Sequence, residues 1–102
     1  MATYDEVDMA IEKRRAELKI SGKVQGVFFR SSIREQARAN GLGGWVQNMP
    51  DGTVEATLEG TAEDVEDVVE WARQGPEAAE VEDIDVQWLE PQGDSHTFQI
   101  RR

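Results

Sequence analysis

The sequence predicts an α+β domain in which two helices cover one face of an antiparallel sheet. Some stretches alternate apolar and polar residues, which is typical of half-buried strands, and two others repeat apolar residues every three or four positions, which is typical of helices. Their order along the 102-residue chain is β-α-β-β-α-β with a final strand. Because each crossover is expected to be right-handed, both helices fall on one face, which predicts the ferredoxin-like α/β sandwich.

The first strand marks the start of the predicted domain. Residues 1–15 show a weak helical repeat among acidic residues, so we expect a flexible or loosely docked extension there and an independent domain over residues 16–102. The strand begins near Glu17 and alternates strictly. Gly22 falls on its core-facing side, where a missing side chain predicts a bend or a close approach of another backbone.

Each helix has its own start and stop signals. The first repeats Phe29, Ile33 and Ala37, after a loop over residues 25–28. Ser32 followed by Glu35 predicts a capping box, and Asn40-Gly41 predicts the end. The second begins after Thr61 as N-cap, and Gly75-Pro76 ends it.

The remaining strands are a hairpin and two closing strands. A strand over residues 44–48 meets a Pro-Asp-Gly turn and pairs with residues 53–59. In that partner we expect alternate residues to point inward (Val54, Ala56, Leu58) and outward (Thr53, Glu55, Thr57, Glu59). The closing strands lie around residues 84–88 and around Phe98 and Ile100.

Composition excludes several classes of function. The chain has no cysteine, which rules out thiol nucleophiles, disulfides and Cys-ligated metals, and a lone histidine, His96, cannot build a multi-His zinc site. Its 21 acidic and 11 basic residues give a net charge of −10, which argues against a nucleic-acid partner. We interpret acidic side chains such as Glu63, Asp64 and Glu66 as a solvated helix face and expect no bound metal.

The acidity also suggests an environment. An acidic, lysine-poor surface is similar to those of proteins from halophilic organisms, where high salt screens self-repulsion. No apolar run is long enough to span a bilayer, and we expect a cytoplasmic monomer without a membrane partner.

The segment Gly22–Arg30 carries the first candidate site. Its glycine-containing loop places backbone amides at a helix start, where the helix dipole attracts an anion, and Arg30 adds a planar fork of donors suited to phosphate or carboxylate. A simple turn beside a solvated arginine is the alternative. Asn48 ends the second strand at the same sheet edge, because the first two strands run parallel in this fold. Its amide could orient a water molecule, or merely cap the turn before Pro50.

These segments resemble the signatures of the acylphosphatase family. Gly22–Arg30 reads G-x-V-Q-G-V-x-F-R, and the residues from Gly44 to Gly60 match the second signature at every spaced position. The likeness runs from about residue 16 to the C-terminus, including the ending Phe98-Gln99-Ile100-Arg101.

The resemblance implies hydrolysis of a small-molecule acyl phosphate to carboxylate and phosphate, with no cofactor and no metal. It implies that Arg30 binds the phosphoryl group and that Asn48 holds the attacking water. The phosphate cradle would be formed by the backbone amides of Gln25, Gly26, Val27, Phe28, Phe29 and Arg30. The alternative is a module that binds phosphate or another anionic effector on the same fold without turnover.

Other side chains receive plainer interpretations. Asp94, Ser95 and His96 are too close in sequence to form a hydrolytic triad. We expect Arg34 and Arg38 to pair with nearby acids. The tryptophans, Phe28 and Phe29 are assigned to core or loop packing rather than to base stacking.

Overall fold

The computed structural model describes residues 12–93 and 96–102. The strands and helices follow the predicted order: β1 (Lys13–Lys23), α2 (Phe29–Ala39), β2 (Gly43–Asn48), β3 (Val54–Thr61), α3 (Ala62–Ala72), β4 (Glu80–Leu89) and β5 (Phe98–Arg101). Asp94 and Ser95, and residues 1–11 of the predicted extension, lie outside this range.

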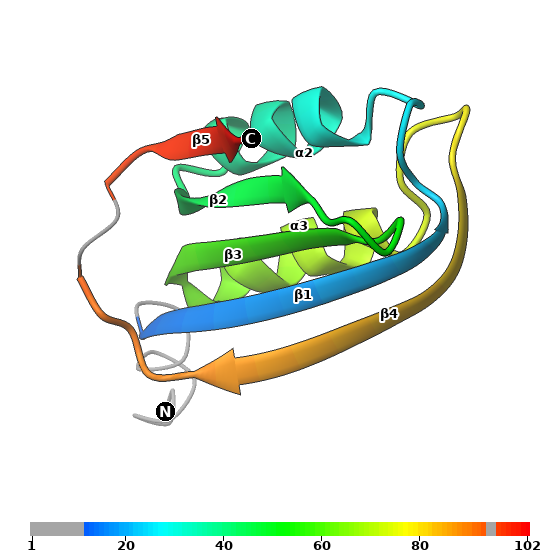
Figure 1. Ribbon diagram of the computed structural model, residues 1–102. Helices are drawn as coiled ribbons and strands as arrows, with labels where there is room; N and C mark the ends of the chain where they lie inside the picture. The colour runs from blue at the N-terminus through cyan, green and yellow to red at the C-terminus, as the bar shows by residue number, and fades with distance from the viewer. Residues whose placement is uncertain (1–11, 94–95) are drawn as a thin grey trace.

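The five strands form one sheet in the order β4-β1-β3-β2-β5, with both helices on the same face (Figure 1). This confirms the ferredoxin-like α+β class. Pairing is antiparallel from β4 through β2, whereas β5 lies parallel to β2, a departure from the fully antiparallel sheet that we predicted. Because β1 and β2 both run antiparallel to β3, they are parallel to each other and end at the same sheet edge.

The core lies between the sheet and the two helices. Apolar residues of β1 and β3 meet those of the helices, and each helix buries the face that its repeat predicted, with Ile33 and Val65 fully enclosed. Val54, Ala56 and Leu58 point inward as expected. No helix in the described part of the chain is long and apolar enough to cross a membrane.

The start of β1 corrects the predicted domain boundary. The strand begins at Lys13, so residues 13–15 belong to the sheet and not to an extension. Arg15 is 8% exposed and pairs with Glu59, its register partner on β3, with Nη1 and Oε1 3.2 Å apart. The predicted domain starts too late because Arg15, a charged residue outside the recognised alternation of the first strand, occupies a buried position of the sheet.

The second face of the sheet is also partly covered. Thr53, Thr57 and Glu59, predicted to face solvent, are 9%, 1% and 7% exposed, so that prediction is wrong for these three residues. The amides of Gln92 and Gly93, in the connection between β4 and β5, each donate to the Glu59 carboxylate at 2.8 Å. The connection therefore crosses this face and shields Glu59 from solvent.

Gly22 sits at an irregularity in the sheet, as its position in the first strand predicted. The register between β1 and β4 shifts between Ser21 and Gly22. Gly22 has φ of 120°, and a Cβ there would lie 2.2 Å from the carbonyl oxygen of Glu80. The close backbone approach thus requires glycine, and the bend lets the end of β1 turn toward α2.

The two helices start differently. Thr61 caps α3 as predicted, with its Oγ1 accepting from the amide of Asp64. The predicted capping box of Ser32 and Glu35 is wrong, because α2 begins at Phe29, and Phe28 precedes it in a left-handed conformation without any side-chain cap.

Arg38 corrects a second expectation. Among the described residues, its guanidinium pairs with no acid and instead donates to the carbonyl oxygen of Phe98 from Nε at 3.2 Å and Nη2 at 3.0 Å. Because Phe98 begins β5, this contact fixes the last strand against α2. The sequence could not reveal this partner, because the location of β5 beside α2 depends on the order of strands in the sheet.

Glu59 makes the stability of the fold sensitive to acid. Burial by itself would raise the pKa of Glu59, but the amides of Gln92 and Gly93 and the Arg15 guanidinium outweigh it and hold that pKa below the ordinary value of 4.5. A carboxyl group whose pKa is lowered by folding stabilises the folded state at pH values above its ordinary pKa. This contribution is lost as the pH falls through the lowered pKa.

We therefore expect Glu59→Gln to lower the free energy of unfolding by about 2 kcal/mol at pH 7, because Arg15 and the amides lose a charged partner. The difference from the wild type should shrink as the pH falls below 4.5. Urea denaturation at several pH values measures it, with the exposed Glu80→Gln as control. An unchanging difference from pH 7 to pH 3 would contradict this account.

Candidate active site

The β1–α2 loop, residues 24–28, is anchored in the core by two of its side chains, while other residues of the loop are exposed. Val24 and Val27 are buried in the core, while Gly26 and Phe28 point outward. Gly26 has φ of 74° and Phe28 φ of 65°, so two left-handed residues flank Val27. Alternation of left-handed and right-handed residues turns successive amides toward the same side and forms a concave nest for an anion.

The amides of this loop are free. Within residues 12–93 and 96–102, no acceptor pairs with the backbone amides from Gln25 through Ser31, and the first amide of α2 to bond is that of Ser32, to the Phe28 carbonyl at 3.0 Å. The first turn of α2 carries no acidic residue, whereas the first turn of α3 carries Glu63 and Asp64. The positive end of the α2 dipole is therefore open to an external anion.

Gln25 joins the loop to the β2–β3 turn, residues 49–53. Its side-chain Nε2 donates to the carbonyl oxygens of Met49 and Thr53, both at 2.8 Å. The turn itself closes with a hydrogen bond from the Met49 amide to the Thr53 carbonyl at 2.9 Å. The predicted role of Gln25 was a backbone one, and the structure adds a side-chain role that its place in the motif did not reveal.

Asp51 holds the same turn from within. Its Oδ1 accepts from the Thr53 amide at 3.0 Å and from the Thr53 hydroxyl at 2.6 Å, and these bonds lower the pKa of Asp51, with a further contribution from Lys19. Asp51 therefore caps the turn, the task that sequence reasoning offered as an alternative for Asn48.

Asn48 is the last residue of β2 and stands just before this turn. In the described part of the chain its side chain has no hydrogen-bond partner, and its Oδ1 is shielded from solvent. A buried amide oxygen without a donor is costly, so an arrangement that retains one indicates a binding requirement rather than a structural one. Donor and acceptor ends of an asparagine can exchange by rotation of the amide, which suits a group that receives one partner and donates to another.

Loop, helix start and strand end surround one cavity of about 610 Å³. Predicted site residues that line it are Gly26, Phe28, Phe29, Arg30 and Asn48. The side chains of Gln25 and Val27 do not line it, because the former is bound to the turn and the latter is buried. The lining residues that sequence reasoning missed are Val24, Ser31, Ile100 and Arg102.

Two of the four lining residues were missed for the same reason. Ile100 and Arg102 belong to the end of the chain, and they reach the cavity because β5 pairs with β2. Figure 1 shows β1, β2 and β5 pointing toward the end of the sheet where the β1–α2 loop lies. The matched ending Phe98-Gln99-Ile100-Arg101 includes Ile100 but not Arg102, and nothing in its spacing indicated the neighbouring strand.

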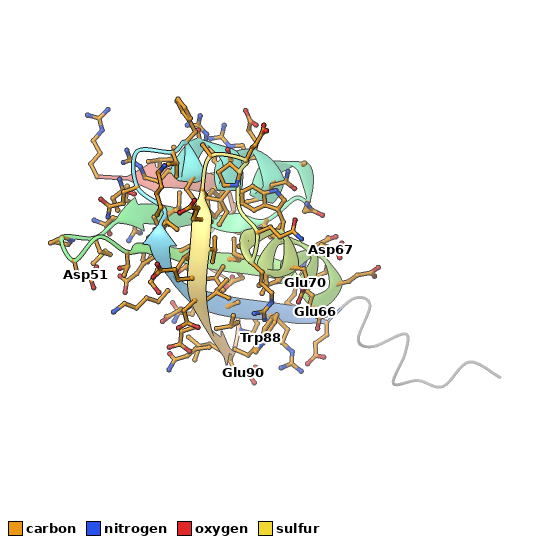
Figure 2. All side chains as sticks on the ribbon, turned by 90° about the vertical axis from the view of Figure 1, so that its right-hand side faces the viewer. Asp51, Glu66, Asp67, Glu70, Trp88 and Glu90 are labelled. Atoms are coloured by element: carbon orange, nitrogen blue, oxygen red, sulfur yellow. The ribbon has the colours of Figure 1, made fainter. Side chains whose placement is uncertain are left out.

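The charge around the cavity differs from that of the whole protein. Arg30 and Arg102 are the charged side chains that line it among the described residues, although the net charge of the chain is −10. Figure 2 shows Glu66, Asp67 and Glu70 together on α3, with Glu90 near the end of β4. The acidic side chains thus concentrate on other surfaces, and the cavity is a local positive region that an anion can enter.

The fold and this site define a ferredoxin-like domain with a loop of unpaired backbone amides at a helix start. A family model described as Acylphosphatase matches residues 16–100. The acylphosphatases of Pyrobaculum arsenaticum and Pyrobaculum aerophilum are 55% and 56% identical to the chain over 91 residues, which cover 88% of this chain and 96% of each relative. The crystal structure of the acylphosphatase from Bacillus subtilis superposes with a TM-score of 0.84 at 32% identity, over 87% of this chain and 99% of that one. The chain belongs to the acylphosphatase family.

Removal of the Gln25 amide should separate the loop from the turn that carries Asn48. We expect Gln25→Met, which keeps the length of the side chain, to lower kcat on an acyl phosphate about tenfold, because one side of the cavity loses its alignment with the other. The free energy of unfolding should fall by about 1–2 kcal/mol for two lost hydrogen bonds.

Steady-state kinetics and urea denaturation measure both effects. Gln99→Met is the matched control, because Gln99 is exposed on β5 and its side chain hydrogen-bonds to Thr97 alone among the described residues. A Gln25→Met variant that loses stability but keeps kcat would assign this amide a structural role without any role in positioning.

Proposed function

We propose that Arg30 and the amides of the β1–α2 loop hold the phosphoryl group of an acyl phosphate, and that Asn48 orients the attacking water. The chain hydrolyses acyl phosphates to a carboxylate and inorganic phosphate. The observation that carries the assignment of roles is that free amides, a guanidinium and an unpartnered carboxamide line one cavity.

The chemistry of the substrate explains why these groups suffice. The water oxygen bonds to phosphorus while the bond from phosphorus to the acyl oxygen breaks, and the electron pair leaves with a carboxylate. Because a carboxylate is a weak base, it departs without protonation, and a phosphate oxygen can take the proton of the water. The protein needs to stabilise the equatorial phosphoryl oxygens and to place the water in line, which amides, a guanidinium and an asparagine can do without titrating.

The alternative, a module that binds an anion without turnover, is not favoured. An anion-binding loop by itself requires Arg30 and the amides, but it has no need for a carboxamide that lines the same cavity and has no partner among the described residues. Membership of the acylphosphatase family points the same way.

Loss of the guanidinium should be the most damaging single change. We expect Arg30→Ala to lower kcat/KM on benzoyl phosphate by about 100-fold or more, corresponding to about 3 kcal/mol of transition-state stabilisation. Arg34→Ala, one helical turn further on and outside the cavity lining, is the matched control and should retain turnover. Phosphate release measures both, and near-normal turnover by Arg30→Ala would exclude its role.

Loss of the Asn48 carboxamide should affect turnover more than binding. We expect Asn48→Ala to reduce kcat by about 100-fold while the inhibition constant for inorganic phosphate changes little, because the amide acts on water and not on the phosphoryl group. The comparison needs kcat, KM and phosphate inhibition for the variant and the wild type. An effect confined to KM would count against water positioning.

The acidic surface is proposed to be an adaptation to high salt. Its support is the excess of acidic over basic residues and the exposure of acidic side chains on α3. Mobile ions shorten the range of charge interactions to about 3 Å at 1 M salt, compared with about 8 Å at physiological strength. Repulsion of a dianionic substrate by these carboxylates should therefore weaken as salt is added.

We expect kcat/KM for benzoyl phosphate to rise several-fold between low salt and 1 M potassium chloride, with a parallel rise in the midpoint of thermal unfolding. A kinetic profile that is flat or falls with salt would contradict this proposal. Cytoplasmic location and a monomeric state remain predictions from the sequence, as does the flexible or loosely docked extension, which was predicted over residues 1–15 and is untested for residues 1–11.

A further inference from the structure

Phe28 differs from the other large apolar side chains of the protein. It is 78% exposed, compared with 41% for Trp88 and 38% for Leu89, the other exposed large hydrophobic residues in the described part of the chain. Trp88 and Leu89 lie on β4, whereas Phe28 lines the cavity of the active site. The largest exposed apolar surface on a single residue therefore stands at the mouth of a polar site.

The backbone of Phe28 is also unusual. Its φ of 65° makes it the one non-glycine residue with positive φ among residues 12–93 and 96–102. An aromatic residue is disfavoured in this conformation, in which glycine or asparagine is accepted more readily. Strain of this kind persists where it serves a site, and the backbone here needs the left-handed turn but not the phenyl ring.

The ring does not contribute to the core. Its neighbour Phe29 is 1% exposed and packs against Trp71 with ring centroids 5.7 Å apart, whereas Phe28 is absent from the core cluster. A phenyl group needed for folding would be buried as that of Phe29 is. The exposed ring of Phe28 is therefore free to contact a molecule in the cavity.

The cavity has a second apolar wall. Ile100, from β5, is partly buried against the core and lines the same space as Phe28, while Arg30, Ser31 and Asn48 supply its polar groups. A phosphoryl group bound by the amides and Arg30 must direct its acyl substituent to a part of the cavity that these donors do not occupy. Among the apolar residues that line the cavity, Phe28 has the exposed side chain and Ile100 is partly buried.

We propose that Phe28, together with Ile100, contacts the acyl group and selects acyl phosphates whose acyl portion is aromatic or otherwise apolar. This inference rests on the proposed function, because it assumes that the phosphoryl group occupies the β1–α2 loop. Phe28 is then a specificity-determining residue at the second of the two variable positions of the first motif, between Val27 and Phe29.

The test compares an aromatic with a small ligand in two independent assays. Turnover is measured as kcat/KM for benzoyl phosphate and for acetyl phosphate, and binding as the Kd of benzoylphosphonate and of acetylphosphonate, which the enzyme cannot hydrolyse. The variants Phe28→Gly and Phe28→Asn remove the ring with residues that accept the left-handed conformation. Phe28→Tyr keeps an aromatic ring, and Leu89→Asn removes an exposed apolar side chain outside the cavity.

We expect the ratio of benzoyl to acetyl values to fall about tenfold in Phe28→Gly and Phe28→Asn, in both assays, and to be kept in Phe28→Tyr and Leu89→Asn. A ratio cancels any common effect on the phosphate loop. A ratio within twofold of the wild type in both ring-deleted variants overturns the inference, as does an equal fall in Leu89→Asn. Failure of the proposed function is separate: it is seen when the wild type binds both phosphonates but hydrolyses neither phosphate.

Discussion

The structure depends on keeping a run of backbone amides unpaired at the start of α2. An ordinary helix start is closed by a side-chain cap and acidic residues, and α3 of this protein is closed in that way by Thr61, Glu63 and Asp64. At α2 these groups are missing, and the preceding residue is held left-handed. Because unpaired amides contribute no hydrogen bonds to the stability of the fold, other contacts must hold the loop in place. Val24 and Val27 anchor it in the core, and the Gln25 side chain hydrogen-bonds to the β2–β3 turn.

The sheet brings the groups of the site together across long stretches of sequence. β3 lies between β1 and β2 and runs against both, which makes the ends of β1 and β2 neighbours and places Asn48 beside the loop. The pairing of β5 with β2, supported by the bond from Arg38 to the Phe98 carbonyl, then adds Ile100 to the wall of the cavity. At another place in the sheet the buried pair of Arg15 and Glu59 secures the connection that leads to β5. Contacts remote from the cavity thus determine its shape.

The distribution of charge separates two requirements. A net charge of −10 keeps molecules apart from one another, whereas the reaction needs a region that accepts a dianion. Acidic side chains gather on α3 (Figure 2), whereas the charged side chains that line the cavity among the described residues are Arg30 and Arg102. Amides and a helix dipole supply positive potential without adding ionised groups, and this contribution acts at short range, where screening by salt is weakest.

The sequence by itself determined the order of the elements, the helix-covered face of the sheet and the residues expected at the site, because hydrophobic periodicity and motif spacing are local properties of the chain. It also placed the glycine that the bend of β1 requires. Only the tertiary structure decided that α2 starts without a side-chain cap, that Arg15, Thr57 and Glu59 are buried, and that Gln25 reaches the β2–β3 turn. The tertiary structure also decided that Arg38 binds the Phe98 carbonyl and that Ile100 lines the cavity, because β5 joins the sheet beside β2. Each of these features depends on which segments become neighbours, and that information lies in the packing of distant strands rather than in any local pattern.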